Sequence, residues 1–259
     1  MNTTRRDQLM DGAAAWYPHV KTVWRASVPS TNTLLADEAR AGDVSDKVLF
    51  AGRQTAGRGR VGRQWWSESA DNLYVSARTT CHVPMAHIGL ISLGCAVMCV
   101  RAIGEGVVIK WPNDLLNTAG QKVGGILCES IPGVGPGACY VLGVGLNLRS
   151  APQLETAASL HVTDEAAASL SLKLAMSLLE VPQWVVNDRE GLLHEWRKHA
   201  HTLGRTVEIS GRRGIATNVD DTGALLLDTA GGPQRILAGD VTMIEHHLEA
   251  VHDRSDSLL

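Results

Sequence analysis

The stretch from Gln54 to Trp66 has the composition of a loop that binds a small anion. Its sequence, Q-T-A-G-R-G-R-V-G-R-Q-W-W, includes three glycines, three arginines and two adjacent tryptophans, and no Asp or Glu occurs between Leu49 and Ser67. Glycine lets a backbone approach a ligand closely. Arginine suits phosphate or carboxylate oxygens, and an indole offers a flat apolar face to a fused ring. We therefore expect a loop without a core of its own that orders around an anionic ligand.

Two other interpretations of this stretch stay open. A Gly/Arg-rich segment can be a disordered contact to nucleic acid, or it can be a solvated surface loop. The net charge of the whole chain is −3, which disfavours general affinity for nucleic acid, so any basic function has to be local.

Three further stretches place polar groups where strands are expected to end. They are K-W-P-N-D at 110–114, K-V-G-G-I-L at 122–127 and G-V-G-L-N at 143–147. Taken singly, a turn, a surface lysine and a satisfied core amide would explain them. Because they occur together with the arginine loop, we interpret all four as parts of one site positioned by a rigid sheet.

The hydrophobic pattern predicts strands and helices in a single α+β unit that positions these stretches. The expected strands are 21–27, 47–52, 72–80, 107–111, 122–131 and 138–148. The expected helices are 33–41, capped by Ser30, Thr31 and Asn32, then 84–103, 163–179 and 184–199. Pro182 is expected to interrupt the helical pattern between the last two.

The pattern changes after Leu203. Short strands are expected at 205–209, 214–219, 224–229 and 234–237, separated by D-D-T-G and A-G-G-P turns. They predict a small antiparallel barrel. We therefore expect a catalytic domain at 1–201 and a small β-barrel domain at 202–259.

Composition indicates a cytoplasmic protein. The hydrophobic content is 44% and the charged content is 20%, and the N-terminus lacks the apolar run of a signal peptide. The five cysteines are an odd number scattered through apolar runs, which is typical of a reducing compartment. Neither the cysteines nor the ten histidines form a metal-ligand pattern, and the P-loop motif is absent from the sequence.

The chain resembles the biotin–protein ligases. G-R-G-R-V-G-R-Q-W at 57–65, S-T-N at 30–32, the three stretches above and the terminal β unit match that family in order and spacing, from Val23 to Ile244. The resemblance implies the mixed β-sheet with packed helices of the biotin–lipoate ligase catalytic fold, which is like that of class II aminoacyl-tRNA synthetases. It also implies an SH3-like C-terminal β-barrel.

The same resemblance implies a two-step reaction. Biotin and MgATP give biotinyl-5′-AMP and pyrophosphate, and biotin then passes to one lysine of a biotin carboxyl carrier domain. Attack of a carboxylate on a phosphate brings two anions together, so fixed positive charge is needed between them. Lys122 is the first candidate for this catalytic role, aided by Arg58 and Arg60.

Roles for the remaining residues follow from the resemblance. The residues expected to bind biotin are Ser30, Thr31, Asn32, Gln54, Gly57, Arg58, Arg60, Lys122, Gly124 and Gly125. The residues expected to bind ATP or the adenylate are Arg58, Arg60, Arg63, Trp65, Asn113, Asp114, Lys122 and Asn147. Asp114 is expected either to order the metal–phosphate end or to meet the incoming lysine, and no residue is assigned as a metal ligand.

Two departures from the family pattern and two rival functions complete the expectations. Val61 stands where many relatives have another arginine, and about twenty residues precede the first strand, too few for a winged-helix repressor domain. We expect a monomer or weak homodimer that binds neither nucleic acid nor membrane. The nearer rival is a lipoate or octanoate ligase or transferase of the same fold, and the more distant one is a nucleic-acid-binding module that uses the loop arginines with Trp65 and Trp66.

Overall fold

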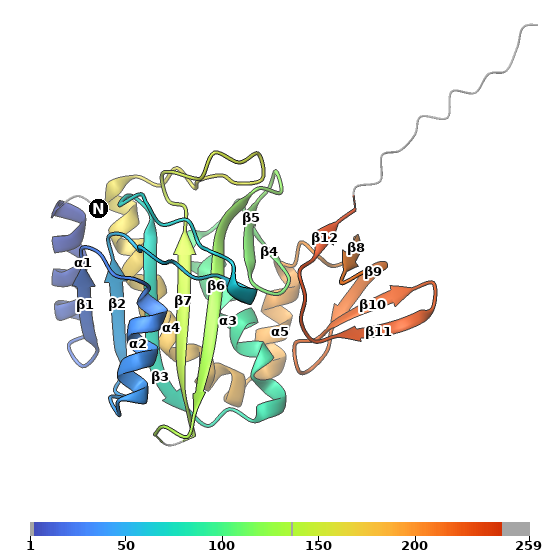
Figure 1. The fold of residues 1–259 in the computed structure, drawn as a ribbon, viewed down its shortest axis with the longest axis horizontal. Helices are drawn as coiled ribbons and strands as arrows, with labels where there is room; N and C mark the ends of the chain where they lie inside the picture. The colour runs from blue at the N-terminus through green and yellow to red at the C-terminus, as the bar shows by residue number, and fades with distance from the viewer. Residues whose placement is uncertain (1–2, 136, 245–259) are drawn as a thin grey trace, which may run out of the picture.

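The chain folds into a larger α/β part and a smaller, all-β C-terminal part that lie side by side (Figure 1). The computed structural model describes residues 3–135 and 137–244. The α+β class and the mixed sheet with packed helices, followed by a small β unit, are confirmed. The boundary between domains at residue 201 stays a prediction.

The larger sheet is mixed. Its strands in the described chain are β1 (Lys21–Arg25), β2 (Lys47–Ala51), β3 (Leu73–Cys81), β4 (Val107–Lys110), β5 (Asp114–Asn117), β6 (Lys122–Pro132) and β7 (Ala138–Leu146). Their order across the sheet is β1-β2-β3-β7-β6-β5-β4. Strand β1 runs parallel to β2, and the other neighbouring pairs are antiparallel. Strand β7 is almost entirely buried, and β3 is buried over its first seven residues.

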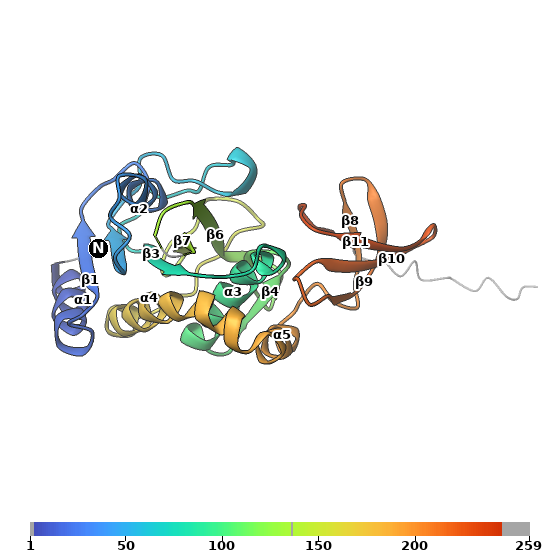
Figure 2. The same cartoon turned by 90° about the horizontal axis from the view of Figure 1, so that it is seen from below.

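Helices cover the two faces of the sheet unequally. The helices of the described chain are α1 (Thr3–Trp16), α2 (Thr31–Arg40), α3 (Gly89–Ile103), α4 (Asp164–Asn187) and α5 (Arg189–Lys198). Figure 2 shows α2 on one face, together with the loop at 52–66, and α1, α3 and α4 on the other. Helix α3 is apolar around most of its circumference because it is enclosed by the sheet, α4 and α5. The arginine loop therefore lies on the face that only α2 covers.

Helix α1 was not predicted from the sequence, because its polar composition gives almost no amphipathic pattern. Tertiary contacts stabilise it instead: Leu9 and Ala13 are buried in the main core, and Arg5 donates to the carbonyl of Asp71 (3.0 Å) and to Ser171 Oγ (3.3 Å).

The prediction that Pro182 interrupts the fourth helix is wrong. Helix α4 continues through Pro182 to Asn187, and α5 begins after Asp188, whose Oδ1 accepts from the backbone N of Gly191 at 2.9 Å. A proline removes one backbone donor inside a helix. The burial of Val181 and Val185 on either side outweighs that loss.

Two short strands were not predicted. They are β5, which follows the 111–113 turn, and β12 (Thr242–Met243). Strand β5 pairs with β4 and β6 and thereby fixes the position of its first residue, Asp114.

The smaller sheet is antiparallel and corresponds to the predicted C-terminal β unit. Its strands in the described chain are β8 (Thr206–Ile209), β9 (Arg212–Val219), β10 (Leu225–Thr229), β11 (Gly232–Ile236) and β12, in the order β11-β10-β9-β8-β12. Trp111, just after β4, joins the two parts: its backbone N donates to Thr202 Oγ1 (2.8 Å) and its indole Nε1 donates to the carbonyl of Gly223 (3.0 Å). In the described residues no helix is long and apolar enough to cross a membrane.

Asp220 organises the turn between β9 and β10. Its Oδ1 accepts from the backbone N of Thr222 (2.9 Å) and of Ala224 (3.0 Å), and its Oδ2 accepts from Arg235 Nε (2.5 Å). Burial favours the protonated acid, but the hydrogen bonds from Thr222 and Arg235 outweigh it and lower the pKa of Asp220 from 3.8 to about 2.

We expect Asp220→Asn to destabilise the protein by about 2 kcal/mol at pH 7. Because the pKa is lower in the folded state, the stabilisation is complete above about pH 4 and is lost as the pH falls toward 2. Urea unfolding of wild type and mutant at pH 7, 4 and 2.5 measures the difference. Asp221→Asn, in the exposed neighbour, is the control, and a wild-type advantage that does not shrink below pH 4 would contradict this account.

Candidate active site

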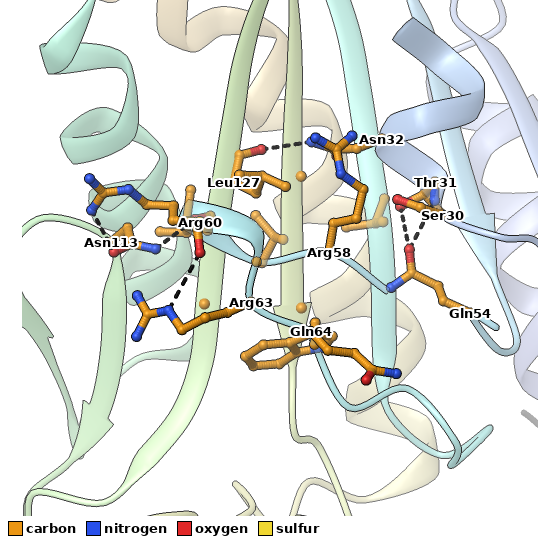
Figure 3. A pocket seen from close by; sticks show the side chains of 18 of the residues that line it. Ser30, Thr31, Asn32, Gln54, Arg58, Arg60, Arg63, Gln64, Asn113 and Leu127 are labelled. Carbon is orange, nitrogen blue, oxygen red and sulfur yellow. Dashed lines mark hydrogen bonds between the residues drawn. The ribbon is translucent and has the colours of Figure 1, made fainter. Parts of the chain in front are cut away.

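A cavity lies between the arginine loop, the start of α2 and the face of the sheet that this helix covers (Figure 3). Eleven predicted site residues line it together with apolar side chains of β3, β6 and β7. These residues are Ser30, Thr31, Asn32, Gln54, Arg58, Arg60, Arg63, Trp65, Asn113, Lys122 and Gly125. The structure thus brings together residues from four separate stretches of the sequence.

Glycines keep the floor of the cavity free of side chains. Gly125 on β6 pairs with Gly145 on β7, and Gly143 lies two residues further along β7 on the same face. A Cβ at Gly145 would lie 2.5 Å from the Trp65 indole, and one at Gly143 would collide with the Asn32 amide. The G-V-G-L-N stretch therefore allows Trp65 and Asn32 to lie directly on the backbone of the sheet.

The start of α2 forms the polar end of the cavity. The helix begins at Thr31, two residues earlier than predicted, and Ser30 is its N-cap: Ser30 Oγ accepts from the backbone N of Thr33 (3.4 Å). The first-turn N–H of Thr31 has no partner within the helix and donates to Gln54 Oε1 (2.9 Å), and Thr31 Oγ1 lies 3.2 Å from the same oxygen. Gln54 Nε2 in turn donates to Ser67 Oγ (3.1 Å), which ties the two ends of the arginine loop together.

The arginine loop folds back on itself over the cavity. The backbone N of Gly59 donates to the carbonyl of Arg63 (2.7 Å), and the backbone N of Trp65 donates to the carbonyl of Gly57 (2.9 Å). Val61 lies at the exposed tip in a left-handed conformation (φ 54°) that is unfavourable for a β-branched residue.

Carboxylates that are distant in sequence pair with two of the three loop arginines. Arg58 Nη2 lies 2.8 Å from Glu129 Oε1 on β6, and Arg63 Nη2 lies 2.6 Å from Asp240 Oδ1 in the C-terminal part. Arg60 Nη1 instead donates to Asn113 Oδ1 at 3.2 Å (Figure 3), and no carboxylate within the described ranges pairs with it.

Lys122 reaches the cavity because of an irregularity in β6. Leu115 pairs with Gly124 but Leu116 pairs with Lys122, so β6 contains one extra residue there. Such a bulge reverses the alternation of side chains and turns Lys122 to the face of Gly125. Its Nζ lies 2.5 Å from Asp114 Oδ1 and 5.5 Å from the centre of the Trp65 ring.

The charges around the cavity do not cancel. Asp114 lies 3.8 Å from Lys110 Nζ as well as contacting Lys122, so two lysines share one carboxylate. The three loop arginines have two carboxylate partners, Glu129 and Asp240, among the described residues. Five cations and three carboxylates leave two positive charges, which suits an anionic ligand.

A second, larger cavity adjoins the first on the other side of Trp65. Its lining includes Trp66, Asn147, Pro152 and Leu154. Asn147 is buried and its Nδ2 donates to the carbonyl of Ala158 (3.1 Å). Both cavities are lined by Gln54, Gln64, Trp65 and Lys122. Lys122 and Trp65 therefore lie at the junction of two compartments.

Four predicted residues do not line the first cavity. Asp114 does not line the first cavity itself but contacts Lys122, which does. Asn147 lines the second cavity. Gly124 faces the core, where a Cβ would lie 2.6 Å from Leu146 Cδ2. Gly57 faces the far end of the same loop, where a Cβ would lie 2.6 Å from Ser67 Oγ. The two glycines serve packing of the chain against itself.

Sequence reasoning missed several residues of the site. They are Ser76, Glu129 and Asp240. Lys110, Gly143 and Gly145 lie in stretches that were predicted to belong to the site, but they were given no role of their own. A signal existed for Glu129, because strict alternation along β6 places it on the same face as Gly125. No local pattern indicates Asp240, whose role depends on the packing of the C-terminal part.

Cys128 packs against the core rather than lining the cavity. Its Sγ lies 3.7 Å from Cys95 Sγ on α3, and burial raises the pKa of the Cys95 thiol. Among the described residues, no group of three or more His, Cys, Asp or Glu side chains could hold a metal ion.

Known proteins resemble this chain in sequence and in fold. A family model for the biotin/lipoate A/B protein ligase family matches residues 24–147, and a model for the biotin protein ligase C-terminal domain matches residues 202–243. The chain is 34% identical over 256 residues to the biotin–[acetyl-CoA-carboxylase] ligase of Mycobacterium tuberculosis, covering 91% of this chain and 92% of that protein. The chain belongs to the biotin protein ligase family.

Two further family members agree with this assignment. A biotin–[acetyl-CoA-carboxylase] ligase from Paracoccus denitrificans is 30% identical over 214 residues, which cover 74% of this chain and 88% of that protein. The structure of a biotin protein ligase from Aquifex aeolicus in complex with biotin and ATP has a TM-score of 0.67 at 24% identity, covering 86% of this chain and 98% of that one. The fold is thus the one that the family resemblance implied.

We expect Gly145→Ala to displace Trp65 and open the arginine loop, because the new Cβ would overlap the indole. Trypsin should then cut the loop after its arginines faster than in the wild type. The rate should rise roughly tenfold for each 1.4 kcal/mol by which the free energy of loop opening falls. Peptide mass spectrometry of the digest measures the rate.

Gly231→Ala is the matched control, since the nearest atom to a Cβ there is 3.8 Å away. Equal cleavage rates in the two variants would show that the indole does not close the loop.

Proposed function

We propose that this protein is a biotin–protein ligase that forms biotinyl-5′-AMP and pyrophosphate from biotin and MgATP. It then transfers the biotinyl group to one lysine of a biotin carboxyl carrier domain. Family membership supports this reaction, and one geometric observation favours it most. Lys122 lies where two cavities meet, one with a polar end and one beside the indoles of Trp65 and Trp66.

In this proposal biotin occupies the first cavity and the adenosine of ATP occupies the second. The biotin carboxylate oxygen attacks the α-phosphorus, and the bond from that phosphorus to pyrophosphate breaks. Both reactants are anions, so the ammonium of Lys122 between them lowers the barrier. Mg²⁺ enters bound to the phosphates of ATP, which is its usual coordination. Asp114 fixes the position of the ammonium through the 2.5 Å contact.

The second step needs a carboxylate that accepts a proton, and it needs biotinyl-5′-AMP to stay bound until the carrier arrives. The carrier amine attacks the acyl carbon of the mixed anhydride, AMP leaves, and the amine loses a proton. Asp114, beside Lys122 and partly exposed, supplies a carboxylate for that proton. Arg60, which pairs with no carboxylate in the described chain, is available to bind the phosphate of the adenylate.

The polar end of the first cavity favours biotin over lipoate or octanoate. Thr31 donates to Gln54 there, and Ser76 connects Thr31 with Asn32. Thr31 and Asn32 are almost fully buried. A cyclic urea offers two N–H donors and a carbonyl acceptor to such a group. An alkyl chain or a dithiolane ring offers neither, so buried polar groups would stay unpaired.

The test is a substrate panel. The protein is incubated with ATP and Mg²⁺ and with biotin, lipoate or octanoate in turn, and the acyl-adenylate is measured by mass spectrometry. A site built to hydrogen-bond a ligand rejects an analogue without those groups by about 10⁴-fold, so only biotin should give adenylate at low concentration. Comparable yields from octanoate would refute the assignment of the substrate.

Lys122→Ala should slow adenylate formation by about 10²- to 10³-fold, and should slow transfer from preformed biotinyl-5′-AMP much less. The expected split follows from the position of Lys122 between the two anions of the first step. Biotin-dependent pyrophosphate release and single-turnover transfer measure the two steps separately.

Lys110→Ala is the matched control, because it removes a charge from the same carboxylate, at 3.8 Å, without changing the lining of the first cavity. If Lys122→Ala and Lys110→Ala released pyrophosphate at the same rate, a role for Lys122 between the two anions would be excluded.

A further inference from the structure

Glu129 contacts two different groups of the site. It lies on β6, on the face of Gly125 and Leu127, and its side chain is 22% exposed. One carboxylate oxygen pairs with Arg58 Nη2 at 2.8 Å, and the other accepts from Asn32 Nδ2 at 2.9 Å. Glu129 therefore connects the arginine loop on one side with the first turn of α2 on the other.

The contact to Asn32 fixes the orientation of a buried amide. Asn32 is 3% exposed, and its Nδ2 donates both to Glu129 and to the backbone carbonyl of Leu127 (2.9 Å). Its Oδ1 accepts from Ser76 Oγ at 2.6 Å. A flipped amide would place its oxygen against the Leu127 carbonyl and the Glu129 carboxylate, so only the observed orientation is compatible with both neighbours.

This orientation determines what Asn32 can offer to a ligand. Both hydrogens of its amide nitrogen are used by Glu129 and Leu127. Oδ1 has two lone pairs, and Ser76 uses one of them. Toward the cavity, which Asn32 lines, the residue can therefore act only as a hydrogen-bond acceptor.

The orientation of the Asn32 amide also affects the side chains that are hydrogen-bonded to it in series. Ser76 Oγ also lies 2.7 Å from Thr31 Oγ1. Because the single hydroxyl hydrogen of Ser76 is used by Asn32, the Thr31 hydroxyl is the donor in this contact, and Gln54 Oε1 accepts from the backbone N of Thr31. Ser76 is fully buried, so it has no water to replace a lost partner. A change in the Asn32 amide would alter the direction of these hydrogen bonds at the polar end of the cavity.

The contact of Glu129 with Arg58 is the weaker candidate for a role in binding. The Arg58 side chain is 47% exposed, and ion pairs of exposed groups contribute little. A charged acceptor bonded to a buried amide contributes more. The contact to Asn32 should therefore dominate the effect of Glu129 on ligand affinity.

We propose that Glu129 is a positioning residue that makes Asn32 an acceptor for an N–H of the cyclic urea, and so contributes to the choice of biotin. This inference rests on the proposed function, since it needs biotin as the ligand. Glu129 would act through Asn32 and Arg58, the two residues of the site that it contacts.

The test compares ligand binding by calorimetry in wild type, Glu129→Ala and Glu129→Gln. For Glu129→Ala we expect biotin and desthiobiotin, which keeps the urea, to bind about 10- to 100-fold more weakly. ATP binding without biotin should change less than about threefold. Glu129→Gln keeps an oxygen for Asn32 while it removes the charge facing Arg58, so it should restore most of the biotin affinity. Ser130→Ala, in the exposed neighbour on β6, controls for damage to the strand, and thermal unfolding confirms that each variant is folded.

Two double-mutant cycles separate the two contacts. Adding Glu129→Ala to Asn32→Ala should weaken biotin binding no further, whereas adding it to Arg58→Ala should weaken binding by the full factor. Coupling to Arg58 instead of Asn32, or unchanged binding by Glu129→Ala, would overturn the inference. Wild-type protein that binds no biotin would refute the proposed function itself, which is a different result.

Discussion

The gathering of five cations around one cavity is the constraint on which the rest of this structure depends. Arg58, Arg60, Arg63, Lys110 and Lys122 would repel one another in a compact fold unless carboxylates were placed among them. The three carboxylates come from three places: Asp114 from β5, Glu129 from β6 and Asp240 from the C-terminal part. One of the carboxylates that face the loop arginines thus comes from the C-terminal part of the molecule.

The sheet contributes the complementary feature, a floor without side chains. Gly125, Gly143 and Gly145 lie on adjacent strands and face the cavity, so the volume that side chains would fill is left to Asn32 and Trp65. The bulge at the start of β6 then adds one long cation to this bare surface. Glycines exclude other side chains and the bulge directs Lys122, so a common β-sheet becomes a site with defined charge and shape.

Features that depend on neighbours in sequence could be predicted, and features that depend on pairing across the fold could not. The central strands and the helix capped by Ser30 followed from local patterns, and Lys122, which was expected at the start of a strand, lines the cavity. The continuation of α4 through Pro182 was not predictable, because burial of distant surfaces decides it. The absence of acids near the loop arginines in sequence was a correct observation, but the fold supplies Glu129 and Asp240 from elsewhere.

These ion pairs also decide how much each arginine can contribute to ligand binding. An anion that binds Arg58 or Arg63 has to replace a carboxylate already there, at 2.8 Å and 2.6 Å, so only the difference between two favourable interactions is gained. Arg60 exchanges a neutral amide oxygen at 3.2 Å for a charged one and therefore gains more. The three arginines look equivalent in sequence, yet their contacts differ: under the proposed function Arg60 is the loop arginine best placed to bind the ligand anion, whereas Arg58 and Arg63 are engaged by Glu129 and Asp240.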